Sequence, residues 1–233
     1  MKSEAASPDR TQGGKRRCTI LPFERNSRFS EVIFTDKNKK GTGTDKKGGE
    51  RVSMETERLL LRKWCPADAD SLYEYARDVA VGPIAGWRPH KSRGESLAVI
   101  RNILCGAECY AVCDKRSGRA IGSVELMLNG HTGKTEGARE CELGYWLGKP
   151  FWGRGYMTEA ARELLRRAFE ELGMEKVICG YYEGNERSRR VQEKLGFVYH
   201  YTSENSSVPL LNEIRVEYVN VLTKERWTEL KSK

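Results

Sequence analysis

The sequence predicts a single α/β domain built on one mixed sheet, and three observations lead to this prediction. The 233 residues suffice for one substantial core with an appendage. Strand-like segments alternate with segments in which apolar residues recur every three or four positions, in the order βααβββαβαββ. The turn residues Ser117 and Gly118 separate two strand-like runs, which predicts a hairpin. Strands and helices interleaved along one chain are typical of a sheet covered by helices.

The strands are predicted from short apolar or alternating runs. The segment KVICGYY at residues 176–182 is continuously apolar, which is typical of a buried strand, whereas NEIRVEYVNVL at residues 212–222 alternates. A polar loop around residues 129–139 precedes the central strand. Seven strands are expected in all, at residues 56–64, 109–128 (two strands), 140–148, 176–182, 197–203 and 212–222.

The helices are predicted from their apolar periodicity and from signals at their ends. Asp68, just after Pro66, is a candidate cap of the first helix, and Ser92 with Glu95 stands in capping-box register at the start of the second. Gly173 is expected to end the longest helix. About four helices are expected, at residues 65–78, 92–104, 156–172 and 185–196, with a terminal helical turn at residues 223–231.

Residues 1–53 differ from the rest of the chain. They hold 13 Lys and Arg against 7 Asp and Glu, whereas residues 54–233 hold 28 against 26, so most of the net charge of +8 belongs to this segment. Its apolar runs are short, and we expect a disordered basic tail before a folded domain at residues 54–233. One hypothesis is a native start at Met54, because residues 46–51 can be encoded by a purine run that resembles a bacterial ribosome-binding site; the alternative is a genuine tail.

Composition argues against several classes of protein. Residues 54–233 show no basic stripe interleaved with aromatic residues, so nucleic acid is not an expected partner. The sequence has neither an apolar run of 18 residues nor a hydrophobic leader, so we expect a cytoplasmic protein with no membrane partner. The seven cysteines form no C-x-x-C pair and the three histidines lie far apart, so reduced, mostly buried thiols are expected rather than a metal site.

The stretch WGRGYMT at residues 152–158 places two glycines at a helix entrance. Glycine is unfavourable there unless a ligand must approach the backbone closely. The first N–H groups of a helix lack internal partners and attract anions, so a strand, a glycine loop and a helix can hold phosphate groups; plain turn residues are the alternative. Because neither G-x-x-x-x-G-K-[ST] nor G-x-G-x-x-G in a βαβ unit is present, the pattern favours a diphosphate held without a lysine or a metal.

The paired motifs ELGYWLGKPFWGRGYMTEA and NERSRRVQEKLGF resemble the GNAT superfamily of acetyl-CoA-dependent N-acetyltransferases. They are most similar to the branch that contains the ribosomal-protein N-terminal acetyltransferases. The resemblance covers residues 54 to about 222. It implies a mostly antiparallel seven-stranded sheet in which the fourth and fifth strands splay apart, with pantetheine lying between them.

The resemblance also implies a set of cofactor-binding residues. The loop at residues 152–157 would bind the pyrophosphate of CoA through backbone amides, although Trp152 replaces the family's Gln or Arg and Met157 replaces a small residue. The side chain of Asn185 would bind the pantetheine arm. The complete set expected to bind acetyl-CoA is Trp146, Leu147, Trp152, Gly153, Arg154, Gly155, Tyr156, Met157, Thr158 and Asn185.

Two residues are expected to be catalytic. Acetyl transfer needs an amine that loses a proton and a leaving thiolate that gains one. Glu142 matches the position of a glutamate base in the family; a solvated edge carboxylate is the alternative. Gln192 stands where many members have a proton-donating tyrosine, so Ser188 is the expected substitute, with a surface serine that contacts CoA as the alternative. Tyr181 or Tyr182 could also serve as the donor.

The loop at residues 81–90 is expected to bind the acceptor, with Trp87 and His90 as its candidate residues. The expected function is transfer of an acetyl group from acetyl-CoA to a primary amine, either a protein N-terminus or a small molecule, by direct attack in a ternary complex. A non-catalytic acyl-CoA-binding module and a nucleotide sensor are the alternatives. No metal is expected, and the chain would be a monomer or a homodimer.

Overall fold

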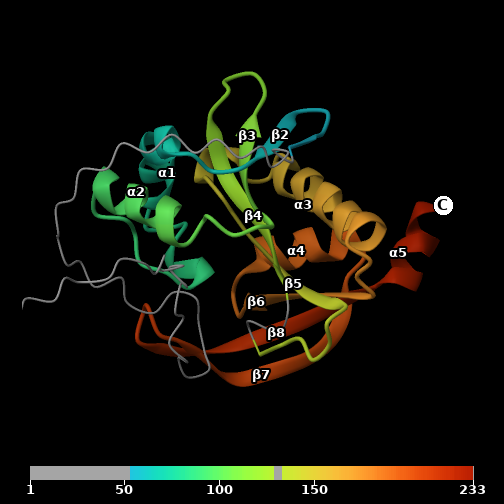
Figure 1. Cartoon of the computed structure of the whole chain (residues 1–233). Helices are drawn as coiled ribbons and strands as arrows, with labels where there is room; N and C mark the ends of the chain where they lie inside the picture. The colour runs from blue at the N-terminus through green and yellow to red at the C-terminus, as the bar shows by residue number, and fades with distance from the viewer. Residues whose placement is uncertain (1–52, 129–132, 233) are drawn as a thin grey trace, which may run out of the picture.

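The computed structural model describes residues 53–128 and 133–232, and these form one sheet covered by helices (Figure 1). The strand order is β1-β2-β3-β4-β5-β6-β8-β7. The described strands are β1 (Met54–Glu55), β2 (Leu59–Arg62), β3 (Cys109–Asp114), β4 (Ala120–Leu128), β5 (Glu140–Leu147), β6 (Lys176–Tyr182), β7 (Val198–Val208) and β8 (Glu213–Thr223). The described sheet has eight strands instead of the expected seven, because Met54 and Glu55 pair with Leu61 and Leu60 as an additional short edge strand.

The neighbouring strands pair antiparallel, with one exception at the centre of the sheet. β5 and β6 run parallel and pair at only three positions, ending with Glu142 opposite Ile178. Beyond Glu142 the two strands diverge, while β5 remains paired with β4 as far as Leu147. This confirms the predicted splay, which lies between β5 and β6 once β1 is counted.

Five α-helices are described, and they confirm the four expected helices. They are α1 (Ala69–Ala76), α2 (Arg93–Asn102), α3 (Tyr156–Arg166), α4 (Glu186–Leu195) and α5 (Lys224–Lys231). The predicted terminal turn is a complete helix because Thr223 caps it by accepting a hydrogen bond from Arg226. Ser92 caps α2 as predicted, accepting from the Glu95 amide at 3.1 Å. The expected cap at Asp68 is wrong, since its carboxylate binds Arg62 and the Cys65 amide instead.

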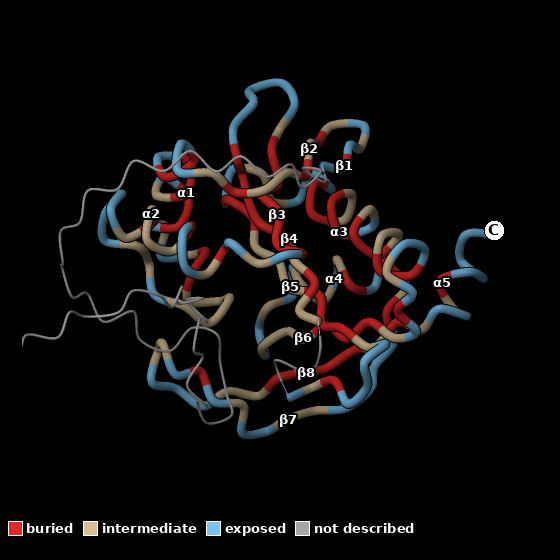
Figure 2. Tube along the Cα trace, in the orientation of Figure 1, coloured by how far each residue is buried: buried red, intermediate tan, exposed pale blue. Residues whose placement is uncertain are grey.

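The core lies where α3 covers the sheet (Figure 2). Leu164 and Leu165 are fully buried on the inner face of α3, which continues as a π-helical turn over residues 167–171 and stops before Gly173, as predicted. Four cysteines are buried in this core and in the neighbouring one under α1 and α2: Cys109, Cys113, Cys141 and Cys179. Burial raises the pKa of the Cys109 thiol to about 12, so these thiols pack as neutral groups.

No helix in the described ranges is both long and apolar enough to cross a bilayer.

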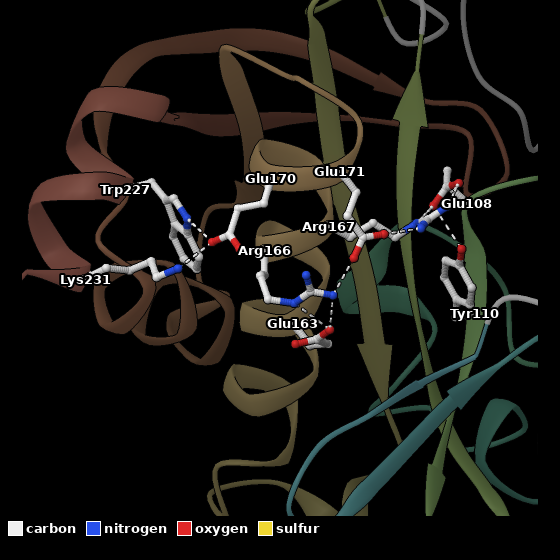
Figure 3. Close-up of polar contacts among 9 residues, drawn as sticks. All are labelled: Glu108, Tyr110, Glu163, Arg166, Arg167, Glu170, Glu171, Trp227 and Lys231. Carbon is white, nitrogen blue, oxygen red and sulfur yellow. Dashed lines mark hydrogen bonds and ion pairs between the residues drawn. The ribbon is translucent and has the colours of Figure 1, made fainter.

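Ion pairs fasten the outer side of the α3 segment to β3 and to α5 (Figure 3). Arg167 binds both carboxylate oxygens of Glu108, at 2.6 and 2.8 Å, and Tyr110 donates to the same carboxylate at 2.9 Å. Glu170 accepts from Trp227 and Lys231 of α5. These contacts hold the turn that follows α3 against the start of β3 and against α5.

Candidate active site

A cavity of about 1130 Å³ follows the gap between β5 and β6. At one end it is lined by the glycine loop, the first turn of α3 and α4, and at the other end by the loop at residues 81–90 together with β7 and β8. Because side chains alternate along a strand, Glu142 and Trp146 face one side of the sheet and Tyr145 faces the other. The gap therefore connects both faces of the sheet through one cavity.

The glycine loop presents a row of unpaired backbone amides. Gly153 and Gly155 have φ angles of +74° and +79°, in the left-handed region that glycine adopts most readily. Among the described residues, the amides of residues 153–158 have no hydrogen-bond acceptor, and they open the 11-residue helix α3. Six successive donors at the positive end of a helix dipole suit a diphosphate, so the residues present fit the pyrophosphate of CoA.

The side chains of the loop divide into two groups. Trp152, Gly153, Gly155, Tyr156, Met157 and Thr158 line the cavity. Arg154 is not among the cavity-lining residues; its guanidinium lies 5.5 Å from the centre of the Tyr156 ring, and its carbonyl accepts from Arg58. Of the ten expected cofactor-binding residues, Arg154 is therefore placed at the rim rather than in the cavity.

Trp152 has a structural role at the end of β5. Its indole N–H donates to the Leu147 carbonyl at 2.7 Å, and the guanidinium of Arg187 lies 4.4 Å from the centre of its ring. Trp152 thus joins the glycine loop to both splayed β5 and α4. Trp146 also lines the cavity, and it stacks on Trp64 with ring centres 6.3 Å apart.

A hydroxyl pair lies where β5 meets α4. The Ser188 Oγ lies 2.9 Å from the Tyr145 hydroxyl, and the Gln192 amide donates to the same Oγ at 3.1 Å. Burial raises the pKa of Tyr145 well above its usual value, so its hydroxyl stays protonated across the neutral range. Asn185 caps α4 through its side-chain oxygen, which accepts from the Ser188 amide. Gln192 is fully buried and also bonds the Gly180 carbonyl and Asn220, which is a packing role.

Glu142 is buried, with 7% of its surface exposed, so it is not a solvated edge carboxylate. Its Oε1 accepts from Lys134 Nζ at 2.9 Å, and its Oε2 has no hydrogen-bond partner among the described residues. The same Lys134 Nζ binds Glu217 Oε1 at 2.6 Å. Burial lowers the pKa of Lys134, but the two carboxylates outweigh it and raise that pKa well above its usual value. A buried carboxylate oxygen without a donor is unfavourable, so this one is positioned to bind a water or an ammonium group.

Trp87 and His90 both line the cavity. Their rings lie 5.4 Å apart, and Trp87 also meets Trp146 edge-on at 6.0 Å. The Nδ1 of His90 shares a hydrogen bond of 2.8 Å with Ser96, and burial lowers the pKa of the imidazole. A neutral imidazole and two indoles make this wall of the cavity largely apolar.

Sequence reasoning did not identify Lys134, Glu217 or Tyr145. Tyr145 lies three residues after Glu142 on the same strand, and Glu217 stands on the inner face of an alternating strand. These positions could have marked both residues as candidates from the sequence. Lys134 lies in the polar loop before β5, where no periodicity marks it. Among the described residues, no group of three or more His, Cys, Asp or Glu side chains could hold a metal ion.

Two features define a domain of the GNAT type. One is the row of unpaired amides at a helix entrance, and the other is a central pair of parallel strands that splays beside a buried carboxylate. Residues 58–198 match the family model described as "Acetyltransferase (GNAT) domain", and the chain belongs to this family. The membership confirms the resemblance that the two motifs predicted.

Individual relatives match over shorter segments. The chain is 47% identical over 60 residues to "Putative ribosomal N-acetyltransferase YdaF" of Bacillus subtilis, which is 26% of this chain and 33% of that protein. It is 37% identical over 92 residues to "FsC-acetyl coenzyme A-N(2)-transacetylase" of Aspergillus fumigatus, which is 38% of each protein. The matched segments thus span only 33% and 38% of the length of these two curated relatives. The first carries the name of the branch that the motifs resemble.

Solved structures share the whole fold. A crystal structure described as a putative acetyltransferase from T. thermophilus superimposes with a TM-score of 0.67 at 25% identity, and it covers 80% of this chain and 96% of that one. The likeness therefore extends over most of this chain and nearly all of that one.

Proposed function

We propose that the protein transfers an acetyl group from acetyl-CoA to a primary amine by direct attack in a ternary complex. The supporting observation is that one cavity contains unpaired amides at one end and a buried carboxylate with an unpartnered oxygen at the other. The family to which the chain belongs is named for acetyl transfer. Acetyl-CoA supplies an activated acetyl thioester when it is bound.

The residues of the chain orient the two substrates. The amides of residues 153–158 bind the diphosphate, and Asn185 lies beside the path of the pantetheine arm through the gap. Beyond Glu142 the gap-facing backbone of β5 is not paired with β6, so an extended arm can lie there as a pseudo-strand. Holding both reactants in one cavity makes the reaction effectively unimolecular, which removes the need for an acyl-enzyme.

Proton transfer is assigned to groups on the two faces of the sheet. Glu142 Oε2 takes a proton from the acceptor ammonium, directly or through one water. The acceptor nitrogen then bonds to the acetyl carbon as the bond from that carbon to sulfur breaks. The sulfur gains a proton from the Ser188 and Tyr145 hydroxyl pair. The second proton, which the acceptor nitrogen loses as it becomes an amide, passes to solvent and restores that pair. Cys141 and Cys179 are not nucleophiles in this scheme, because burial raises the pKa of both thiols and keeps them protonated.

The acceptor is proposed to enter beside Trp87 and His90. A protein N-terminus and a small-molecule amine both fit this description, and the name of the Bacillus subtilis relative favours a ribosomal protein. The aromatic wall would pack against the apolar part of the acceptor next to its amine.

A thiol-release assay with acetyl-CoA tests the proposal. The acceptors are peptides with N-terminal Ala or Ser, free amino acids, polyamines and aminoglycosides. Release of CoA with at least one acceptor is expected. Calorimetric binding of acetyl-CoA without release across the whole set would instead identify an acyl-CoA-binding module. A folded protein that binds neither CoA nor acetyl-CoA would refute both.

A further inference from the structure

Three charged side chains meet at the point where β5 and β6 part. Lys134 Nζ lies 2.9 Å from Glu142 Oε1 and 2.6 Å from Glu217 Oε1, so one ammonium bridges two carboxylates. The three residues come from the loop before β5, from β5 itself and from β8. The carboxylates are 9% and 8% exposed in their side chains, and all three residues line the cavity. We call this group the carboxylate clamp.

The surroundings of the clamp hold Glu217 in place. Ser206 of β7 donates to Glu217 Oε2 at 2.9 Å, so each oxygen of that carboxylate has a donor. Gly180 of β6 leaves the room that the carboxylate needs, since a Cβ at this position would lie 2.2 Å from Glu217 Oε1 and 3.3 Å from Lys134 Nζ. In contrast, Glu142 has one oxygen bound to Lys134 and the other without a partner among the described residues. The clamp therefore fixes the orientation of Glu142 and leaves Oε2 available.

We propose that Lys134 and Glu217 are positioning residues that hold the Glu142 carboxylate in the orientation in which its Oε2 accepts the proton of the acceptor amine. This inference rests on the proposed function. Neither residue touches the reacting atoms. Lys134 uses its ammonium to orient Glu142, and Glu217 anchors Lys134 from β8, which lies on the other side of β6.

The charges of the clamp give each member a distinct effect. A cation beside a buried carboxylate favours its ionised form, whereas a second carboxylate disfavours it. Lys134 and Glu217 therefore act on the charge of Glu142 with opposite signs. Removal of Lys134 and removal of Glu217 should move the protonation of Glu142 in opposite directions, which loss of packing alone would not do.

Other titratable groups surround the clamp. Tyr182 and Cys179 of β6 and Tyr201 of β7 interact electrostatically with it, and burial raises the pKa of each, so they stay neutral in the acidic range. Glu125 of β4 and Glu95 of α2 are further carboxylates that line the same cavity. Because both are unchanged in every variant, they cannot produce opposite shifts.

The test compares Lys134→Met and Glu217→Gln with the wild-type chain. The acidic limb of kcat/KM is measured with one acceptor, whose own ionisation is then common to all variants. We expect the limb to move up by about one pH unit in Lys134→Met and down by up to about one unit in Glu217→Gln. The KM for acetyl-CoA should stay within about twofold in both. Lys176→Met is the matched control. Lys176 of β6 binds Glu140 of β5 at 2.8 Å, and it does not line the cavity.

A second measurement does not depend on activity. Glutamate carboxyls are labelled with ¹³C, and the Glu142 resonance is identified by its loss in Glu142→Gln. The titration midpoint of this resonance should move up in Lys134→Met and down in Glu217→Gln. Unchanged midpoints, or shifts of equal sign in the two variants, would overturn the clamp even if the enzyme is active. Opposite shifts in a chain that acetylates no amine would refute the proposed function and leave the electrostatic assignment standing.

Discussion

The hydroxyls of Tyr145 and Ser188 lie 2.9 Å apart, one on the splayed half of β5 and the other in the first turn of α4. The Gln192 amide donates to Ser188 Oγ, so that oxygen already accepts one hydrogen bond and its own proton can be donated. Buried Tyr145 stays protonated at neutral pH, since burial raises its pKa. The pair lies beside Gln192, the residue that stands where the family resemblance implies a proton-donating tyrosine, and it is the proton donor of the proposed mechanism.

Ser188→Ala should lower kcat about 10- to 100-fold and leave the KM for acetyl-CoA within about twofold, because a general acid acts on the transition state and not on cofactor binding. Steady-state kinetics measured by thiol release check this. Tyr145→Phe is the paired variant: a large loss in Tyr145→Phe alone would move the donor role to the tyrosine. Full activity in both variants would remove the hydroxyl pair from the mechanism.

Gly155→Glu should abolish CoA binding, since a carboxylate would enter the row of amides that bind the diphosphate. Gly155→Ala should weaken binding more mildly: a side chain at a φ of +79° is strained by about 1–2 kcal/mol, and a loop that moves to relieve this strain displaces its amides. Isothermal calorimetry with CoA measures both. Gly118→Ala is the control: Gly118 has a similar φ of +69° in the β3–β4 turn, where an added Cβ meets nothing within 4 Å. Equal CoA affinity in Gly155→Glu and Gly118→Ala would contradict the assignment of the loop.

Glu142→Gln should lower kcat about 100-fold at neutral pH and leave CoA affinity nearly unchanged, because the amide cannot accept the amine's proton and the diphosphate site is distant along the cavity. Thiol release at saturating acetyl-CoA, together with calorimetry, measures the two effects. An amine acceptor of lower intrinsic basicity should lose less activity in this variant, since less of it is protonated. Full turnover in Glu142→Gln would show that this carboxylate is not the base.

The sequence predicted the features that depend on local chemistry. The cap at Ser92, the stop at Gly173 and the glycine loop are read from short segments, because their physical causes lie within one or two turns. The motifs also placed the splay correctly. The clamp was not predictable in this way, since Lys134 and Glu217 are 83 positions apart and meet only after β8 pairs with β6. Asp68 shows a different error, because its carboxylate binds Arg62, six positions earlier at the end of β2, instead of capping α1.

The last prediction concerns stability and the ion pair between Arg167 and Glu108 (Figure 3). The exposed fractions of their side chains are 12% and 9%, so Arg167→Met leaves a buried carboxylate without its cation and should lower the free energy of unfolding by about 3 kcal/mol at pH 7. Lys231→Met removes a far more exposed pair with Glu170 and should cost less than about 0.5 kcal/mol. Urea denaturation followed by circular dichroism measures both variants.

The pH dependence of the same variant provides an internal check. Burial works to raise the pKa of Glu108, but the hydrogen bonds from Arg167 and Tyr110 outweigh it and hold that pKa below its usual value of 4.5. A carboxylate whose pKa is lower in the folded state stabilises the fold above the unfolded-state pKa, and this contribution is lost as the pH falls through the folded-state value. The difference between wild type and Arg167→Met should therefore be largest near pH 7 and shrink as the pH falls through about 4, because protonated Glu108 no longer needs its cation. A difference that is constant from about pH 7 to about pH 4 would mean that Arg167 stabilises α3 through the packing of its aliphatic stem and not through its charge.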